Sequence, residues 1–297
     1  MPPPGRATGP SAVVFTDLDG TLLDHHTYGF EPARPALDAL RDAGVLLVLC
    51  SSKTRAEIVA VQARLGIGGP FIPENGGAAL LAGGGPLEAV FPERFGGLPA
   101  RVFGTPYPQL RAALEELRRR HGAGVRGFGD MDDEEVARCT GLALEQARLA
   151  RERDFDEPFL WSPPPGEADV TRARAWLAGR GLSLTRGGRF WHLLGPSDKG
   201  RAVRWLLEAA ARLSGRMPAS LALGDSENDL PMLEAVGAGV LVERPGGGHL
   251  TPRPPGIRTV TGVGPPGWCR AVLAWLEDLE QARADGRPPA AEAAPRG

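Results

Sequence analysis

The chain has 297 residues, of which 42% are hydrophobic and 24% are charged, as in ordinary soluble proteins. Its formal net charge of −2 excludes a broad basic surface for nucleic acid or acidic membranes, and no apolar run reaches membrane-spanning length. The three scattered cysteines form neither a disulfide framework nor a metal-binding motif, and the first residues lack the apolar stretch of a signal peptide, so we expect a reducing, cytoplasmic location.

The first third of the chain alternates between strand-like and helix-like segments. Residues 1–11, like 285–297 at the other end, are rich in Pro, Ala and Gly without an apolar period, and we predict disordered tails there. The segments that follow are expected strands at 13–16, 45–50 and 71–73 and expected helices at 32–43 and 54–65. This order is typical of a parallel sheet with right-handed crossovers.

The pattern changes after this point. Residues 78–81 and 87–91, joined by a Gly-rich turn, are predicted to form a hairpin. An α+β pattern follows, with expected helices at 106–120, 132–138, 143–152 and 167–179 and expected strands at 158–161, 182–186 and 190–194. Alternation then returns, with helices at 199–213, 228–236 and 268–284 and strands at 220–223 and 239–242.

This organisation predicts an α/β protein with a doubly wound, mainly parallel, Rossmann-like sheet that is interrupted by an inserted α+β domain. The expected core domain is discontinuous and comprises 12–84 and 192–284, and the expected insert comprises 85–191. Ligands of such sheets bind at the carboxyl ends of the strands. The polar residues at those ends are therefore the candidate site.

The first expected strand ends in Asp17-Leu18-Asp19-Gly20-Thr21. Two carboxylates this close repel each other, and a hard divalent cation is the usual means of offsetting that repulsion. The alternative is an ordinary strand-to-helix turn, for which Asp, Gly and Thr are common residues.

The next two strands also end in polar residues. Ser51-Ser52-Lys53-Thr54 opens a helix, where free N–H groups and the helix dipole favour an anion such as phosphate, although Ser and Thr are also common helix caps. Glu74-Asn75-Gly76-Gly77 follows the third strand, and a turn that needs positive φ at its glycines explains it equally well.

Two late segments complete the set. Lys199 lies in the first turn of a helix, where its charge opposes the helix dipole, which indicates an anion nearby or else a solvated surface lysine. Gly224-Asp225-Ser226-Glu227-Asn228-Asp229 directly follows a buried strand, and stability alone does not require so many acids in one turn.

Taken together, these residues come in the order that defines haloacid dehalogenase-type phosphatases, and the chain resembles that family over about 12–280. The long stretch between Ser51 and Lys199 is similar to the subgroup whose α/β cap follows the third core strand. Within that subgroup the chain resembles the mannosyl-3-phosphoglycerate phosphatase family. The segments that carry this likeness are Ser51-Ser52-Lys53-Thr54, Pro73-Glu74-Asn75-Gly76-Gly77, Arg153-Asp154-Phe155-Asp156-Glu157-Pro158-Phe159, in which Asp154-Phe155 departs from the family's Glu-Tyr, and Gly187-Gly188-Arg189-Phe190-Trp191-His192.

The resemblance implies roles for these residues. Asp17 would be the nucleophile that forms an aspartyl-phosphate, and Asp19 the general acid and base. Mg²⁺ would be held by Asp17, the backbone carbonyl of Asp19 and Asp225. The phosphate would be bound by Ser51, Ser52, Lys199 and Asn228, with Asp229 positioning Lys199, and the expected contacts to the rest of the substrate are Lys53, Glu74, Asn75, Arg153, Arg189 and His192.

The implied reaction is hydrolysis of mannosyl-3-phosphoglycerate to mannosylglycerate, a compatible solute, and phosphate. Phosphatases of the same subgroup that act on glucosyl-3-phosphoglycerate, sucrose phosphate or other sugar phosphates are alternatives, and a phosphomutase is a further variant. From another class, the chain could be a catalytically silent phosphosugar-binding protein. No nucleic-acid or membrane partner is expected, and the sequence predicts no oligomeric state.

Overall fold

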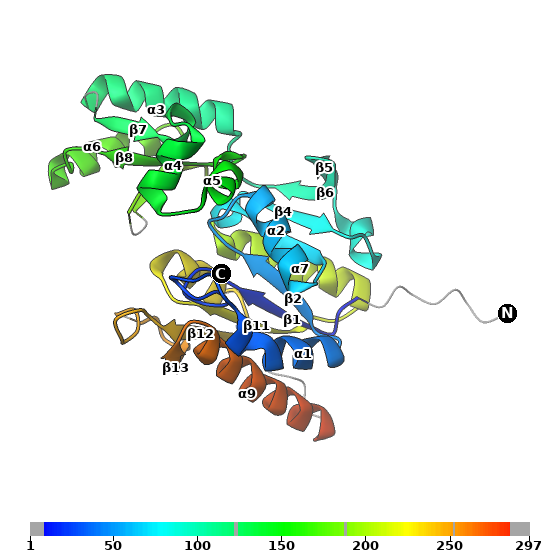
Figure 1. Ribbon diagram of the computed structural model, residues 1–297. Coiled ribbons are helices and arrows are strands. Elements are labelled where there is room, and N and C mark those ends of the chain that lie inside the picture. Colours follow the sequence, from blue (N-terminus) through cyan, green and yellow to red (C-terminus); the bar gives the residue numbers. More distant parts are fainter. Residues whose placement is uncertain (1–8, 122–123, 187–188, 252, 286–297) are drawn as a thin grey trace.

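The computed structural model describes residues 9–121, 124–186, 189–251 and 253–285 (Figure 1). Most of the two predicted disordered tails, 1–11 and 285–297, and Gly187-Gly188 of the family-like segment therefore lie outside the described residues. At the edge of the first tail, the Ser11 carbonyl accepts a hydrogen bond from the Ala219 N–H at 3.1 Å, one residue before β1 begins.

The helices and strands follow the chain order that Figure 1 labels. The α-helices are α1 (Arg34–Asp42), α2 (Arg55–Leu65), α3 (Tyr107–His121), α4 (Asp133–Thr140), α5 (Leu144–Arg151), α6 (Glu167–Ala178), α7 (Lys199–Ser214), α8 (Leu230–Leu233) and α9 (Pro265–Ala284). The strands are β1 (Ala12–Thr16), β2 (Leu46–Cys50), β3 (Gly69–Ile72), β4 (Ala78–Ala82), β5 (Glu93–Phe95), β6 (Leu98–Val102), β7 (Val125–Gly127), β8 (Asp156–Trp161), β9 (Ser183–Arg186), β10 (Trp191–Leu194), β11 (Ala219–Gly224), β12 (Ala238–Glu243) and β13 (Arg258–Val263). None of the helices in the described ranges is long and apolar enough to cross a membrane.

The larger sheet has nine strands in the order β13-β12-β11-β1-β2-β3-β4-β6-β5. The six strands from β13 to β3 are parallel, and β4, β6 and β5 extend the sheet in antiparallel fashion. Thr16 at the end of β1 pairs with Leu223 of β11 on one side and with Leu49 of β2 on the other, so the strand order of the sheet continues to both sides of β1. That is the switch point at which doubly wound sheets bind their ligands.

Helices cover both faces of this sheet. Successive residues of β1 point to opposite sides, so that Val14 packs with α1, α2 and α9, and Phe15 packs with α7 and α8. Both β1 side chains have no exposed surface. The predicted doubly wound, mainly parallel core is therefore present.

The insert contains a separate four-stranded antiparallel sheet in the order β7-β8-β10-β9. Phe159 and Leu193 of this sheet pack against α3 and α6 in one apolar cluster. In Figure 1 the insert, in green, stands at one end of the larger body, with α5 nearest to α2.

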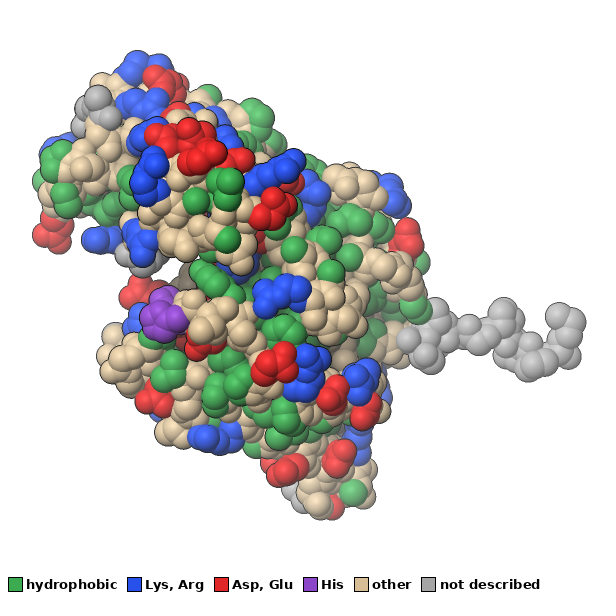
Figure 2. Space-filling model, viewed as in Figure 1, with side chains coloured by type: hydrophobic (Ala, Val, Ile, Leu, Met, Phe, Trp, Pro, Cys, Tyr) green, Lys and Arg blue, Asp and Glu red, His purple; other side chains and the backbone are tan. Residues whose placement is uncertain are grey.

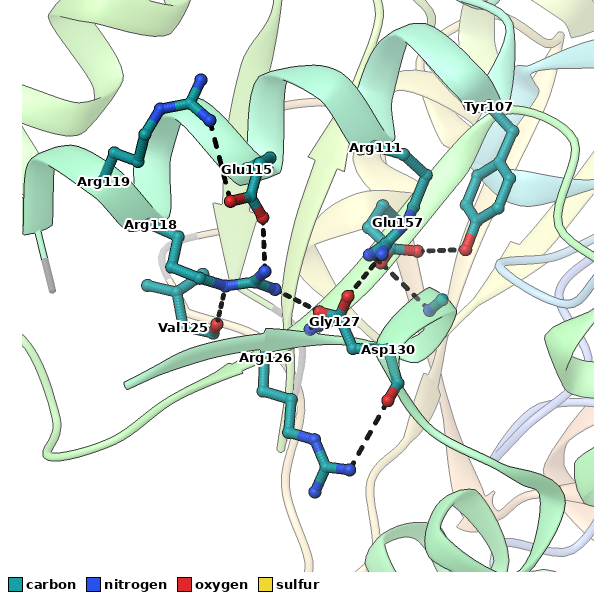
Figure 3. A network of polar contacts seen from close by, with 11 residues as sticks. Tyr107, Arg111, Glu115, Arg118, Arg119, Val125, Arg126, Gly127, Asp130 and Glu157 are labelled. Atoms are coloured by element: carbon teal, nitrogen blue, oxygen red, sulfur yellow. Dashed lines mark hydrogen bonds and ion pairs between the residues drawn. The ribbon is translucent and has the colours of Figure 1, made fainter. Parts of the chain in front are cut away.

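A buried polar network ties the insert together (Figure 3). The carboxylate of Glu157 has no exposed surface and accepts hydrogen bonds from the Tyr107 hydroxyl and from Arg111, both at 2.6 Å. Asp130 in turn pairs with Arg111 and Arg118. Because the buried Glu157 and the partly buried Asp130 both have cationic partners, α3 is held to β8 and to the turn after β7 by more than apolar packing.

The structure corrects two element predictions. Residues 87–91 do not form the second strand of a hairpin; 87–90 lie in a 3₁₀ helix, Pro86–Val90, whose Leu87 packs against Ala210 of α7. The partners of β4 are β3 and β6 instead. The helix expected at 228–236 is also shorter, with a single 3₁₀ turn before α8.

The strands divide between the two sheets at positions that differ from the expected domain boundaries. β5 and β6 belong to the nine-stranded sheet, although the expected insert of 85–191 includes them. β10 belongs to the smaller sheet and extends beyond residue 191, to Leu194. We propose that the insert is the segment between β6 and α7, and that the boundaries at 84 and 192 be moved accordingly.

Candidate active site

The carboxyl ends of β1 and β11 bring three acids and one lysine together. Lys199, which has 1% of its surface exposed, donates to Asp17 Oδ1 at 2.7 Å and to Asp229 Oδ1 at 2.6 Å. The other oxygen of Asp229 accepts from the backbone N–H groups of Asp225 and Ser226 at 3.1 and 3.0 Å. The four residues thus form one connected group, as the sequence predicts.

The same group has the donor set for a hard divalent cation. Asp17, Asp225 and Asp229 each place one carboxylate oxygen within 4.8 Å of the other two. Since both oxygens of Asp229 already accept hydrogen bonds, Asp17 and Asp225 are the acids that remain available. Gly20, with φ of +80°, runs beside Asp225, and a Cβ there would lie 3.1 Å from Asp225 Oδ2. An oxygen-only site of this kind suits Mg²⁺.

Because these acids are buried or partly buried, it is unfavourable for all of them to be ionised at once. Burial raises the pKa of Asp17 well above its usual range, and the neighbouring acids add to this rise while Lys199 opposes it. Burial, followed by repulsion from Asp229, raises the pKa of Asp225 to about 6. One ammonium group therefore does not offset the negative charge of the cluster, and a cation between Asp17 and Asp225 would.

Asp19 lies beside this cluster, on the side of α2. Its Oδ2 is 3.0 Å from the Nζ of Lys53, which is also 3.7 Å from Glu57 Oε1. Its Oδ1 is buried and has no hydrogen-bond partner among the described residues. One oxygen of Asp19 is therefore held in place and the other is free for a reacting group.

The loop that follows β2 supplies hydroxyl and N–H groups. Ser51 is buried, and its hydroxyl accepts from the Lys53 N–H at 3.2 Å. Thr54 caps α2, accepting from the Glu57 N–H at 3.1 Å, and the Glu57 side chain bonds back to the Thr54 N–H at 2.8 Å. This reciprocal cap fixes the start of α2 behind Ser51 and Ser52.

The turn after β3 takes a different role from the one expected. Asn75 Oδ1 accepts from Asn228 Nδ2 at 3.0 Å, which links this turn to the loop after β11. Glu74 has no exposed surface, and its carboxylate accepts from the backbone N–H groups of Asp154 and Phe155. The Glu74 carboxylate thus binds the backbone of the insert, and its predicted contact with the substrate stays a prediction.

Three expected contacts lie on the insert. Arg153 Nη1 donates to the Ser52 carbonyl at 3.0 Å, so this guanidinium reaches the core loop. The Nδ1 atom of His192 lies 2.8 Å from Asp156 Oδ2, and the side chain is 16% exposed. Arg189 is exposed, and it donates to the Cys139 carbonyl.

Several supporting residues had no sequence signal. Trp268 of α9 is buried and donates to the Thr16 hydroxyl at 2.9 Å, and that hydroxyl donates to the Asp17 carbonyl at 2.7 Å. Asp156, which is fully buried and lies 2.8 Å from His192 Nδ1, is different, because it stands in a family-like segment, but no role was predicted for it. Such contacts join residues that are far apart in the chain, and no local pattern reveals them.

A cavity lies between the core and the insert, beside Lys53. The cavity of about 130 Å³ is lined by Tyr28, Lys53 and Glu57 of the core and by Leu142 and Leu149 of the insert. Figure 2 shows that the surface is hollowed between the two bodies. Lys53 lines this cavity and also contacts Asp19, so it connects the cavity to one of the predicted catalytic residues.

Comparisons with known proteins agree with this site. The family model of haloacid dehalogenase-like hydrolases matches residues 14–86 and 195–244. These ranges contain Asp17, Asp19, Asp225 and Asp229. A glucosyl-3-phosphoglycerate/mannosyl-3-phosphoglycerate phosphatase of Methanococcoides burtonii is 40% identical over 267 residues, which cover 88% of this chain and 96% of that protein. The chain belongs to the haloacid dehalogenase-like hydrolases.

Further relatives of this hydrolase support the same assignment. A protein of Persephonella marina with the same name is 36% identical over 280 residues, covering 91% of this chain and 98% of that protein. Among solved structures, Thermoplasma acidophilum 0175 has a TM-score of 0.63 at 19% identity, and the sucrose-phosphatase of Synechocystis has 0.58 at 13%, each covering 89% of this chain and 98% of its own. The structures show the fold alone, whereas the sequence relatives and the family make this chain a phosphoric monoester hydrolase.

Proposed function

We propose that this hydrolase is a Mg²⁺-dependent phosphatase that converts mannosyl-3-phosphoglycerate to mannosylglycerate and phosphate through an aspartyl-phosphate on Asp17. The observation that best supports the proposal is the hydrogen-bonded group of Asp17, Lys199 and Asp229 beside Asp225. It brings together a nucleophile, a phosphate-binding cation and an available oxygen ligand for the metal. The relatives' names support glucosyl-3-phosphoglycerate as the second candidate substrate.

Asp17 begins the reaction. One of its carboxylate oxygens attacks phosphorus, and the bond between phosphorus and the glycerate oxygen breaks. Lys199 and the hydroxyl of Ser51 would hold phosphoryl oxygens and offset the charge that spreads over them. Since Lys199 is fixed by Asp229, its ammonium group needs little rearrangement at this step.

Asp19 moves the proton in both steps. In the first it gives its proton to the leaving glycerate oxygen, and in the second it takes a proton from the water that attacks phosphorus and releases Asp17. Its buried Oδ1, which has no partner among the described residues, is the atom that supports this role. The complete set of competent residues also argues against a silent binding protein.

Mg²⁺ would be held by the carboxylates of Asp17 and Asp225 and by the Asp19 carbonyl, and it would neutralise phosphoryl charge there. The remaining contacts belong to the sugar and the glycerate. Arg153 and Arg189 are proposed to pair with the glycerate carboxylate, because guanidinium groups bind carboxylates in bidentate fashion.

Further contacts with the substrate are proposed for side chains of the core and of the insert. Lys53 and His192 are proposed for sugar hydroxyls, Ser52 and Asn228 for the phosphate, and Asn75 for orienting Asn228. We place the reaction in the cytoplasm, where mannosylglycerate would serve as a compatible solute.

A panel of phosphate esters tests this proposal. Steady-state phosphate release is measured with mannosyl-3-phosphoglycerate, glucosyl-3-phosphoglycerate, sucrose 6-phosphate and mannose 6-phosphate, with and without EDTA. We expect the two glycosyl-3-phosphoglycerates to give the highest kcat/KM and EDTA to abolish turnover, with Mg²⁺ restoring it. Equal rates on all four esters would refute the substrate assignment, and isomerisation of mannose 6-phosphate would indicate a mutase.

A further inference from the structure

Glu74 is a buried acid that neither the nucleophile nor the phosphate-binding group uses. It lies in the turn after β3 with φ of +48°, and its side chain has no exposed surface. Positive φ is uncommon for a residue other than glycine and marks a position that its surroundings over-determine. The contacts of Glu74 therefore need an account of their own.

The hydrogen bonds of its carboxylate in the described residues lead to the insert. The Asp154 N–H donates to both Glu74 oxygens, at 2.9 and 3.1 Å, and the Phe155 N–H donates to Oε2. These two residues immediately precede β8. One core carboxylate thus binds two successive backbone groups of the insert.

The side chain of Phe155 strengthens this attachment. It is 1% exposed and packs in the apolar cluster of the core, with its ring centroid 4.9 Å from that of Phe95. Gly77 allows this approach, since a Cβ there would collide with the Phe155 ring. Residues 154–155 are therefore fixed to the core even though the chain enters and leaves the insert elsewhere.

The backbone of the same turn reaches the phosphate-binding loop. The Glu74 N–H donates to the Lys53 carbonyl at 3.0 Å, and the Asn75 N–H donates to the Ser51 carbonyl at 3.0 Å. Arg153, which directly precedes the two anchored residues, donates to the Ser52 carbonyl at 3.0 Å. Glu74 thus lies between the loop that would bind phosphate and the insert residue that would bind the carboxylate.

We propose that Glu74 is a positioning residue that fastens residues 153–155 of the insert to the turn behind Ser51 and so sets the place of the Arg153 guanidinium. The inference rests on the proposed function only in giving Arg153 a substrate to bind. Removing the Glu74 carboxylate frees two backbone N–H groups and displaces Arg153, while Asp17 and Lys199 keep their own partners.

Hydrogen–deuterium exchange and kinetics of three variants test this inference. Glu74→Ala removes both acceptors, Glu74→Gln keeps one, and Glu93→Gln is the matched control, since Glu93 accepts from the Val102 N–H at 3.0 Å at the far edge of the sheet. Exchange is followed at the amides of residues 154–155 and of β1. Rates are compared for mannosyl-3-phosphoglycerate and for para-nitrophenyl phosphate, which has no carboxylate or sugar.

We expect Glu74→Ala to speed exchange at residues 154–155 but not in β1, and to lower kcat/KM for mannosyl-3-phosphoglycerate by about 10- to 100-fold, mainly through KM. The aryl phosphate should lose less than about threefold, and Glu74→Gln should recover part of the loss. Unchanged exchange, or equal losses on both substrates, would overturn the inference. If the unaltered enzyme does not hydrolyse mannosyl-3-phosphoglycerate, the proposed substrate is wrong, and the exchange result still decides the role of Glu74.

Discussion

Three carboxylates share one ammonium group at the carboxyl end of β1. Lys199 bonds Asp17 and Asp229, and both of those acids are buried, while Asp225 has no cation of its own within hydrogen-bond distance in the described residues. The sequence could predict this cluster, because parallel strands bring their carboxyl ends to one edge. It could not predict that Asp229 uses both oxygens internally, since that depends on backbone N–H groups of its own turn.

Asp17→Asn tests the nucleophile. The amide cannot form the aspartyl-phosphate, so we expect kcat to fall by about four orders of magnitude or more. Because Lys199 keeps Asp229 as a partner and one acid of a repelling group is removed, the melting temperature should not fall. Phosphate release and thermal denaturation are the measurements, and appreciable turnover by the variant would exclude Asp17 as nucleophile.

The raised pKa of Asp225 predicts how metal binding depends on pH. At about pH 5 the Asp225 carboxyl holds a proton that a cation must displace, whereas at about pH 8, above its pKa of about 6, it is ionised. Saturating Mg²⁺ should therefore raise the melting temperature more at pH 8 than at pH 5. Asp225→Asn should reduce this difference, and an equal or larger effect at pH 5 would contradict the assigned ligands.

At the scale of elements, the start of α2 connects the phosphate-binding loop to the insert. The Thr54 hydroxyl accepts from Glu57 within the helix cap and also donates to the Leu149 carbonyl of α5 at 2.8 Å. The cap itself could be predicted from Thr54 and Glu57, because a hydroxyl followed three residues later by Glu is a common helix start. The hydrogen bond to α5 could not be predicted, since it joins a helix of the core to a helix of the insert that is distant in the sequence. The strand β13 could not be predicted either, because most of its residues are exposed and its sequence shows no run or alternation of apolar residues.

Thr54→Ala removes both hydrogen bonds of this hydroxyl. We expect a loss of about 1–2 kcal/mol in the free energy of unfolding from the cap, and about 1 kcal/mol from the bond to α5. Thr54→Ser keeps the hydroxyl and serves as the control, with a much smaller loss. Denaturant titration of both variants checks this, and equal losses would mean that the methyl group, not the hydroxyl, stabilises the site.

At the scale of the whole molecule, the attachment of the insert is the feature that sequence reasoning could not reach. The existence of an insert follows from the change of pattern after residue 78, but its anchoring through Phe155 and Glu74 depends on packing between distant segments. The hairpin expected from 78–81 and 87–91 was wrong for a related reason. Leu87 packs on α7 in a 3₁₀ helix, so tertiary contact decided between two local conformations that its sequence allows.

The buried Glu74 also predicts how stability depends on pH. Burial raises its pKa to about 8, against the partial opposition of Arg153. Between about pH 4.5 and about pH 8 the folded protein keeps a proton that the unfolded chain has lost, so stability falls as the pH rises. The side chain of the Glu74→Gln variant cannot ionise. From pH 5 to pH 8 the free energy of unfolding should therefore fall more in the unaltered protein than in the variant. Parallel pH profiles of the two proteins would contradict the raised pKa.

The covalent step through Asp17 is the centre of this account, and an acid-quenched turnover tests it most directly. The enzyme with Mg²⁺ is mixed with mannosyl-3-phosphoglycerate, and the reaction is quenched within one turnover. The protein is then digested, and the masses of its peptides are measured by mass spectrometry. We predict a transient phosphoryl group on the peptide that contains Asp17, absent from Asp17→Asn. A phosphoryl group on another peptide, or none during single-turnover phosphate release, would contradict the account.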